Sequence, residues 1–335
     1  MRVADYIAQR LVQLGVKRVY GLTGGGASGL NDGFIKNKDI KYICFHHEQG
    51  AGHAAIGETK VTRKISIVNP TTGCGGTNCI TSLLDAWQDS LPVIFISGNV
   101  RTSHTTHFIN KNKKVSIRKY GIQEHNIIST VKSITKYSKF VEKAENIPYE
   151  LDFAINEALS GRMGPVWLDI PSDVQHAEIP KVYKKFVPKT EKIPKEKFNI
   201  QKILSKYSRP LVLAGYGITL SDTQKEFRNF IEKYQLPFVT TYLGIDIIEY
   251  EHILNMGTIG IKGSRAGNFA VQNCDLLLIM GCSLNCSHTG YDESLFAPKS
   301  YKIMIDIDIN EFKKGTIKID KFLNINIKDF LNEYK

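Results

Sequence analysis

The chain has 335 residues, of which 42% are hydrophobic and 23% are charged, and this composition excludes a disordered, collagen-like or small disulfide-stabilised protein. Its net charge of +11 does not predict nucleic-acid binding, because only ten of the basic residues are arginine and, apart from residues 181–197, they are scattered. No apolar run approaches the ~20 residues of a membrane span, the N-terminus has no signal-peptide core, and the six cysteines are irregularly spaced. We therefore expect a soluble, cytoplasmic protein with reduced thiols, no nucleic-acid partner and no membrane contact.

The first half of the chain alternates helical patterns with short apolar runs. Residues 3–15 carry apolar side chains at helical spacing, which predicts an amphipathic helix that ends at Gly15. The apolar runs predict strands at residues 16–22, 40–45, 64–68, 93–97 and 166–170. Strands that alternate with helices in this way indicate βαβ units and a parallel sheet that is buried on both faces.

A second series of the same kind follows a stretch of different composition. Residues 175–197 contain three prolines, many lysines and no glycine, which is typical of an extended linker. Beyond it, strands are predicted at residues 210–215, 237–241, 274–280 and 301–306, with a helix at 221–234. We therefore expect an α/β protein with two doubly wound parallel-sheet domains, at residues 1–172 and 198–335, joined by a linker at 173–197.

The first glycine-rich loop, at residues 24–29, satisfies the pattern GxGxxG and follows a predicted strand. With an acidic residue, Glu48, about twenty positions further on, this pattern is compatible with a dinucleotide-binding fold. Glycines that only make a tight strand-to-helix turn are an equal alternative. The residues that follow Glu48 are small and helically spaced, and an acid that binds a ribose needs no such close-packed helix, which argues against NAD.

Glu48 has two interpretations of its own. A carboxylate that opens a helix at the end of a strand can face a buried ligand, or it can serve only as a favourable charge at the helix N-terminus. A third turn, at residues 71–78 (TTGCGGTN), again follows a predicted strand and precedes a helix. Loops at the carboxyl ends of successive parallel strands are where open α/β sheets bind ligands, so we expect a ligand here.

Seven motifs occur in a characteristic order in the first half of the chain. They are VADYI at 3–7, YGLTGG at 20–25, HEQGAG at 47–52, TTGCGGTN at 71–78, GIQE at 121–124, ITKY at 134–137 and GPVWLDIP at 164–171. Together they resemble the pyrimidine-binding domain of thiamine-diphosphate enzymes of the acetolactate synthase (acetohydroxyacid synthase) large-subunit type. RPLVLAG at 209–215 and NFAVQNCD at 268–275 resemble the central domain of that family.

The resemblance implies a reaction and a set of site residues. The family decarboxylates a 2-oxo acid such as pyruvate and transfers the two-carbon unit to an acceptor carbonyl. Glu48 would share a proton with the N1′ atom of the cofactor's aminopyrimidine, and Gln123 would face the substrate. The implied cofactor-binding residues are Gly24, Gly25, Thr72, Gly73, Cys74 and Asn78. Cys74 and Ile122 stand where acetolactate synthases often have proline and phenylalanine, which leaves the acceptor open.

The implied cofactor is thiamine diphosphate with Mg²⁺. In the family, a third domain holds the metal and the diphosphate through a Gly-Asp-Gly motif and an asparagine pair, and neither motif occurs here. We therefore expect this diphosphate-binding third domain to be absent from the chain, and no metal ligand in it. A missing domain or a separate subunit would supply those ligands. The family's site lies between two chains, which implies a homodimer or higher oligomer.

Several alternatives remain at this stage. FAD is not expected, because residues 281–288 lack the arginines of flavin-binding relatives, and the turn at residues 215–217 is interpreted as plain packing. The chain could instead be a catalytically incomplete regulatory or partner subunit that keeps the fold. An NAD-dependent oxidoreductase built on the loop at 24–29 is a weaker alternative. A nucleophilic role for Cys74 is the weakest, because no accompanying base is evident.

Overall fold

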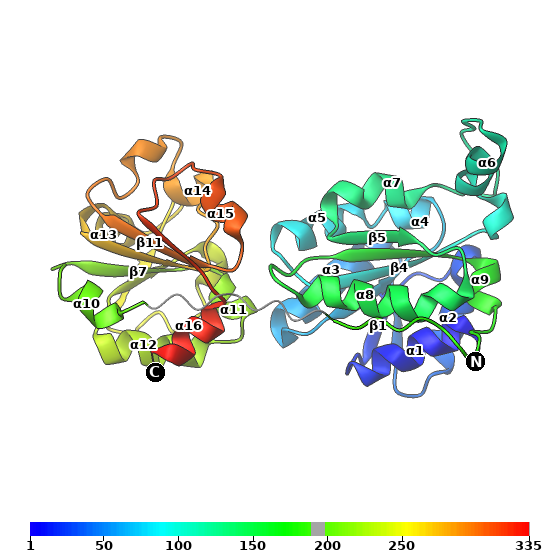
Figure 1. The fold of residues 1–335 in the computed structure, drawn as a ribbon, viewed down its shortest axis with the longest axis horizontal. Coiled ribbons are helices and arrows are strands. Elements are labelled where there is room, and N and C mark those ends of the chain that lie inside the picture. Colours follow the sequence, from blue (N-terminus) through cyan, green and yellow to red (C-terminus); the bar gives the residue numbers. More distant parts are fainter. Residues whose placement is uncertain (189–197, 335) are drawn as a thin grey trace. The chain divides into compact units, whose positions relative to one another are not determined.

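The computed structural model describes residues 1–188 and 198–334, so residues 189–197 of the predicted linker lie outside the described residues. The chain divides into two compact units, Met1–Thr190 (unit 1) and Glu191–Lys335 (unit 2), each built around its own sheet (Figure 1). Among the described residues, no helix combines the length and the hydrophobicity needed to cross a bilayer.

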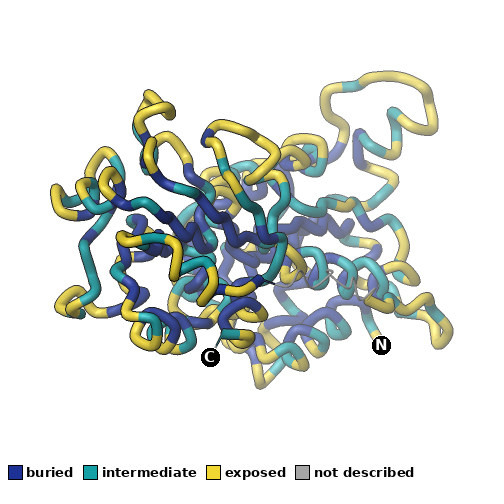
Figure 2. The backbone as a smooth tube through the Cα atoms, turned by 60° about the vertical axis from the view of Figure 1, so that its left-hand side comes forward, coloured by how far each residue is buried: buried dark blue, intermediate teal, exposed yellow. Residues whose placement is uncertain are grey.

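Unit 1 contains a six-stranded sheet with the strand order β2-β1-β3-β4-β6-β5, and every neighbouring pair is parallel. The strands are β1 (Arg18–Gly21), β2 (Lys41–Cys44), β3 (Ser66–Asn69), β4 (Val93–Asn99), β5 (Tyr137–Phe140) and β6 (Val166–Pro171). Every residue of the central strands β3, β4 and β6 is buried, because helices cover both faces of the sheet (Figure 2). The predicted parallel α/β architecture is confirmed.

The helices of unit 1 are α1 (Val3–Gln13), α2 (Ser28–Lys36), α3 (Glu48–Thr62), α4 (Cys74–Thr77), α5 (Ile80–Gln88), α6 (Thr106–Lys113), α7 (Ile127–Val131), α8 (Ile147–Leu159) and α9 (Ser172–His176). The apolar stripe of α1 packs with α2, α8 and the sheet in one core, and the chain turns after the helix at Gly15, whose φ is +83°. Helix α3 packs against α5 and the strands β1 and β3.

The buried tryptophan of β6 packs in the core and begins a series of hydrogen bonds between buried polar side chains. The ring of Trp167 stacks on Phe95 with the ring centroids 4.9 Å apart and the planes 5° from parallel. Its Nε1 atom donates to Oγ of Ser97 at 2.8 Å, and that hydroxyl donates to Oδ1 of Asp169 at 2.7 Å. The polar end of this core side chain is therefore satisfied inside the protein.

Unit 2 repeats the architecture with the strand order β12-β11-β10-β7-β8-β9, again parallel throughout. Its strands are β7 (Pro210–Ala214), β8 (Phe238–Thr240), β9 (Asn255–Thr258), β10 (Leu276–Met280), β11 (Tyr301–Asp306) and β12 (Lys321–Asn324). Its helices are α10 (Ile200–Leu204), α11 (Gly217–Leu220), α12 (Gln224–Tyr234), α13 (Arg265–Asn273), α14 (Cys286–Thr289), α15 (Ile309–Lys313) and α16 (Ile327–Glu333). Two hydrophobic clusters include residues of its strands and of its helices.

The glycines after β7 face the backbone of another loop. A Cβ atom at Gly215 would lie 2.1 Å from the carbonyl oxygen of Gly281, and one at Gly217 would lie 2.7 Å from the Cα atom of the same residue. The amide of Gly217 also donates to that carbonyl at 3.0 Å. Close packing of the two loops therefore accounts for these glycines without a bound phosphate.

The first part of the predicted linker packs on unit 1. Helix α9 overlaps its first residues, and the amide of Val3 donates to the carbonyl of Ala177 at 2.9 Å. The ring of Tyr183 meets Tyr6 with centroids 6.3 Å apart, and that of Phe186 meets Tyr149 at 5.8 Å. These aromatic contacts anchor the stretch against α1 and α8. The sequence did not predict them, because the many lysines and prolines are typical of an extended linker.

Candidate functional site

A cavity of about 550 Å³ opens in unit 1 where loops leave the carboxyl ends of β2 and β3. The sheet order sets β2, β1 and β3 side by side, so the loops that follow these parallel strands meet at one edge. The residues that line the cavity are Glu48, Thr71, Thr72, Cys74, Gly75, Thr77, Asn78 and Gln123. This volume lies in the usual range for a small-molecule site, which spans about 300–1,000 Å³.

Glu48 is the acidic residue of the cavity, and its orientation is fixed by a neighbour. It is the first residue of α3, where the partial positive charge of the helix N-terminus favours a carboxylate. Its Oε2 atom accepts a hydrogen bond of 2.7 Å from Nδ2 of Asn78, whereas Oε1 has no hydrogen-bond partner among the described residues. A Cβ atom at Gly75 would lie 3.2 Å from that Oε1 atom. The glycine therefore keeps space open beside the free carboxylate oxygen.

The small residues of α3 allow it to pack closely behind the cavity. A Cβ atom at Gly52 would lie 1.9 Å from Oγ of Ser82 on α5, so only glycine fits there. The thiol of Cys79 donates to the backbone carbonyl of Glu48 at 3.7 Å. Burial and the nearby Glu48 carboxylate raise the pKa of the Cys79 thiol, which stays neutral and acts as a structural donor.

Gly73 brings the loop after β3 against the loop that carries Gln123. The φ of Gly73 is +60°, and a Cβ atom there would lie 1.6 Å from the carbonyl oxygen of Gln123. Gln123 itself has a φ of +56°, a conformation that a non-glycine residue adopts only when its surroundings hold it. These two backbones in contact bring the Gln123 side chain to the cavity, although it lies 75 residues from Glu48 in the sequence.

The glycine-rich loop lies behind the cavity wall. A Cβ atom at Gly24 would lie 2.5 Å from Oγ1 of Thr71, and one at Gly26 would lie 1.6 Å from Oγ1 of Thr72. Gly25 has open space around it and does not line the cavity. Packing against the next loop therefore accounts for two glycines of the GxGxxG pattern.

The structure thus brings together five of the eight predicted site residues. Glu48, Thr72, Cys74, Asn78 and Gln123 line the cavity, whereas Gly24, Gly25 and Gly73 do not. Sequence reasoning did not single out the lining residues Thr71, Gly75 and Thr77. They belong to the motif at 71–78, but the motif alone does not tell which side chains of a turn face a cavity.

Two buried carboxyl groups lie beneath the Gln123 loop, in motifs whose acids were not singled out. Glu124 is 5% exposed, and its Oε1 atom accepts from the amide of Thr106 at 3.0 Å and from its hydroxyl at 2.8 Å. Its Oε2 atom has no partner among the described residues. Burial is the main cause that raises the pKa of Asp169 to about 7; hydrogen bonds from Ser97 and Asn99 act against it, and the charge of Glu124 acts with it.

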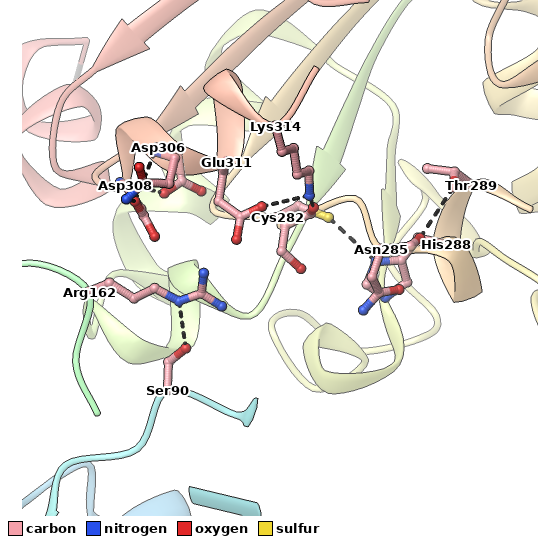
Figure 3. Close-up of polar contacts among 12 residues, drawn as sticks. Ser90, Arg162, Cys282, Asn285, His288, Thr289, Asp306, Asp308, Glu311 and Lys314 are labelled. Atoms are coloured by element: carbon pink, nitrogen blue, oxygen red, sulfur yellow. Dashed lines mark hydrogen bonds and ion pairs between the residues drawn. The ribbon is translucent and has the colours of Figure 1, made fainter. Parts of the chain in front are cut away.

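Unit 2 has a polar cluster at the ends of β10 and β11 (Figure 3). The Sγ atom of Cys282 lies 3.8 Å from Nδ1 of His288, and burial raises the pKa of this thiol to about 12 while it lowers the pKa of the imidazole. Lys314 pairs with Glu311 at 2.7 Å and donates to the carbonyl of Ser283. These contacts hold neighbouring loops together. Among the described residues, no three His, Cys, Asp or Glu side chains are grouped to hold a metal ion.

Comparison with known proteins covers both units. Residues 1–128 match the family model "Thiamine pyrophosphate enzyme, N-terminal TPP binding domain", and this match includes every residue that lines the cavity. Residues 199–334 match "Thiamine pyrophosphate enzyme, central domain".

Individual relatives are about one-third identical. A probable acetolactate synthase large subunit of Methanocaldococcus jannaschii is 33% identical over 94% of this chain and 52% of its own length. The acetolactate synthase large subunit of Lactococcus lactis is 32% identical over 93% of this chain and 53% of its own length. The isozyme 2 large subunit of Escherichia coli is 31% identical, with 100% of this chain and 60% of the relative covered. The chain therefore spans about half the length of the curated relatives it matches.

Proposed function

Because the chain belongs to the thiamine pyrophosphate enzyme family and carries its N-terminal and central domains, we propose that it forms the pyrimidine-binding part of a carboligase of the acetolactate synthase type. The proposed reaction decarboxylates a 2-oxo acid such as pyruvate and transfers the two-carbon unit to an acceptor carbonyl. The observation that carries this proposal is the Glu48 carboxylate, which has one oxygen held by Asn78 and the other beside the space that Gly75 leaves.

The residues of the cavity suit the aminopyrimidine end of thiamine diphosphate. The cavity offers a carboxylate, threonine hydroxyls, two amide side chains and a glycine that admits a flat ring close to Oε1 of Glu48. Polar groups of both donor and acceptor character are what a heteroaromatic ring with ring nitrogens and an amino group requires. When bound, thiamine diphosphate supplies a nucleophilic carbon and an electron sink for cleavage of the bond next to a carbonyl.

Glu48 is proposed as the acid–base residue of the site. The hydrogen bond from Asn78 occupies Oε2 and fixes the plane of the carboxyl group, so Oε1 is the atom that exchanges a proton with the ligand. The cavity leaves Oε1 accessible to a ligand. Gln123, which lies at the same cavity, is proposed to orient the substrate by hydrogen bonding.

The rest of the proposed assembly lies outside this cavity. Mg²⁺ needs oxygen ligands together with the phosphates, so we assign the metal and the diphosphate group to another domain or a partner chain. We also propose that the chain works in the cytoplasm in a homodimer or larger oligomer, as the two-chain sites of this family imply. A second subunit that carries the diphosphate-binding domain is part of this proposal.

The substitution Glu48→Gln tests the function. In the complete assembly, it should lower the rate of CO₂ release from pyruvate by roughly 10²–10⁴, because an amide cannot exchange the proton. The matched control is Glu58→Gln on the same helix, where Glu58 pairs with Arg18 at 2.7 Å, away from the cavity. This control should keep the wild-type rate. Equal rates in wild type and Glu48→Gln, with equal melting temperatures, would remove the basis of the proposal.

A further inference from the structure

One segment of unit 1 carries several positive charges and no acidic residue. Residues 101–122, which we name the basic excursion, contain six Lys or Arg residues and no Asp or Glu. Acid-free stretches of similar length occur elsewhere in the chain, but residues 59–84, for example, contain only three Lys or Arg residues. The excursion leaves the carboxyl end of β4 and includes α6, which stands apart from the sheet in Figure 1.

Most of this charge has no counter-ion. Lys111 lies 3.7 Å from Glu142, which also accepts from His107 at 2.8 Å. The other basic side chains have no ion-pair partner among the described residues, and all of them are exposed. They are Arg101, Lys113, Lys114, Arg118 and Lys119. Two acidic residues outside the excursion also contact it. Glu124 accepts a hydrogen bond from Thr106 and Asp173 accepts one from Thr102, and neither forms an ion pair with its Lys or Arg side chains.

The basic excursion is anchored to unit 1 at both ends, so the backbone that carries its charged side chains is fixed in position. The amide and hydroxyl of Thr102 donate to Oδ1 of Asp173 at 2.9 and 3.0 Å, and Thr105 caps α6. Farther along, the amide of Ile117 donates to Oδ1 of Asn110 at 2.9 Å. At the closing end, a Cβ atom at Gly121 would lie 2.8 Å from the carbonyl oxygen of His104. The two ends of the excursion therefore meet.

The closing end of the excursion leads directly into the cavity. Ile122 is followed by Gln123, which lines the cavity beside Glu48. Lys119 lies four residues before Gln123, so their Cα atoms are at most about 14 Å apart. Exposed apolar side chains accompany the charges, and Tyr120 and Ile122 are 60% and 84% exposed. An exposed surface that combines cations with aromatic and aliphatic groups suits a ligand with an anionic group and an organic body.

We propose that the basic excursion binds the phosphate group of a phosphorylated carbonyl acceptor whose carbonyl end enters the cavity. This inference rests on the proposed carboligase function, because that reaction requires an acceptor at Gln123. A phosphate dianion matches the uncompensated Lys and Arg side chains, and the excursion runs directly into Gln123, which lines the cavity. A neutral acceptor would leave these cations without a role.

The first test measures binding to the full 335-residue chain without cofactor. Glycerol 3-phosphate and glycerol serve as unreactive probes that differ only in the phosphate, and amide NMR shifts give the dissociation constants. We expect glycerol 3-phosphate to bind at least about tenfold more tightly, with shifts in residues 111–123, and this preference should shrink as salt is added. Equal affinities for the two probes would overturn the proposal.

The second test assigns the preference to the excursion. The double variants Lys113→Gln/Lys114→Gln and Arg118→Gln/Lys119→Gln should each reduce the phosphate preference by roughly threefold or more. The control Lys38→Gln/Lys41→Gln removes two exposed charges near the amino end of β2, at the opposite edge of the same sheet, and should leave the preference unchanged. Equal losses in the control would mean nonspecific attraction and would overturn the proposal.

Two further outcomes are informative. If the excursion variants keep their affinity for glycerol 3-phosphate but lose binding of a short RNA or an acidic peptide, the surface serves a macromolecule and the proposal is wrong. If the wild-type chain shows no preference for glycerol 3-phosphate, but Glu48→Gln still lowers the rate of CO₂ release, only this inference is wrong. A phosphate preference that persists while Glu48→Gln has no effect overturns the proposed function instead.

Discussion

Gly73, which lies next to the cavity without lining it, is held at glycine by its backbone conformation. Its positive φ and its contact with the carbonyl oxygen of Gln123 leave no space for a side chain. We expect Gly73→Ala to lower the free energy of unfolding of unit 1 by about 2–4 kcal/mol, since the two loops must separate. Urea denaturation checks this value. Gly25→Ala is the control, because Gly25 has open space around it, and it should change stability by less than about 0.5 kcal/mol.

Asp169 makes stability depend on pH. Burial raises its pKa to about 7 in the folded chain, so the folded state binds the proton more tightly than the unfolded state, where the pKa is ~4. The free energy of unfolding should therefore fall as the pH rises from ~4 to ~7, by up to about 4 kcal/mol, and level off above that range. In Asp169→Asn this component is absent. Melting temperatures at pH 5 and pH 8 for both proteins isolate it, and parallel pH profiles would contradict the assignment.

Glu48 could be predicted from the sequence, whereas several of the residues around it could not. Glu48 could be singled out because a charged residue at a strand-to-helix junction is visible in the pattern of neighbouring residues. Thr71 and Thr77 could not, because the direction of a side chain in a turn depends on backbone angles such as those of Gly73. Gln123 entered through a family resemblance, since its conformation depends on a contact with a loop 50 residues away.

At the scale of elements, the basic excursion depends on one buried side chain at its base. Glu124 accepts two hydrogen bonds from Thr106, the first residue of α6. We expect Glu124→Ala to leave these donors unsatisfied and to lower the local opening free energy by about 1–3 kcal/mol. Hydrogen exchange in residues 105–122 should then accelerate roughly 5- to 150-fold.

The control for this element is Glu142→Gln, which weakens the outer pairs with His107 and Lys111. Exposed pairs of this kind contribute at most about 1 kcal/mol, so exchange should change little. Exchange that accelerates equally in both variants, or that accelerates throughout unit 1, would show that Glu124 does not anchor the excursion specifically.

The strands that the sequence pattern missed are edge strands. β5, β9 and β12 each lie at the end of a sheet, and few of their residues are buried. An edge strand has a neighbour on one side only, so it needs no continuous apolar run, and YSKF, NMGT and KFLN contain none. Central strands such as β4 and β10 are buried along their whole length, which is why their apolar runs predicted them.

At the scale of the whole molecule, each unit has its own hydrophobic core, so we expect the units to lose structure independently. Phe230 of α12 is 1% exposed in the core of unit 2, and Phe230→Ala should cost that unit about 3–5 kcal/mol. Hydrogen exchange should accelerate in residues 198–334 and stay unchanged in residues 1–188. The reciprocal control, Phe34→Ala in unit 1, should give the opposite result. Acceleration of both units by either variant would show that they unfold as one.

The positions of the two tryptophans have an optical consequence. Trp87 and Trp167 are the only tryptophans of the chain, and both belong to unit 1. Trp87 on α5 is 38% exposed, whereas Trp167 is fully buried against Phe95. An aqueous quencher such as iodide should therefore extinguish the emission of the first and spare that of the second. Tryptophan emission, excited selectively over tyrosine, then reports on unit 1 alone. Its unquenched fraction comes from Trp167, whose indole donates to Ser97, which in turn donates to Asp169.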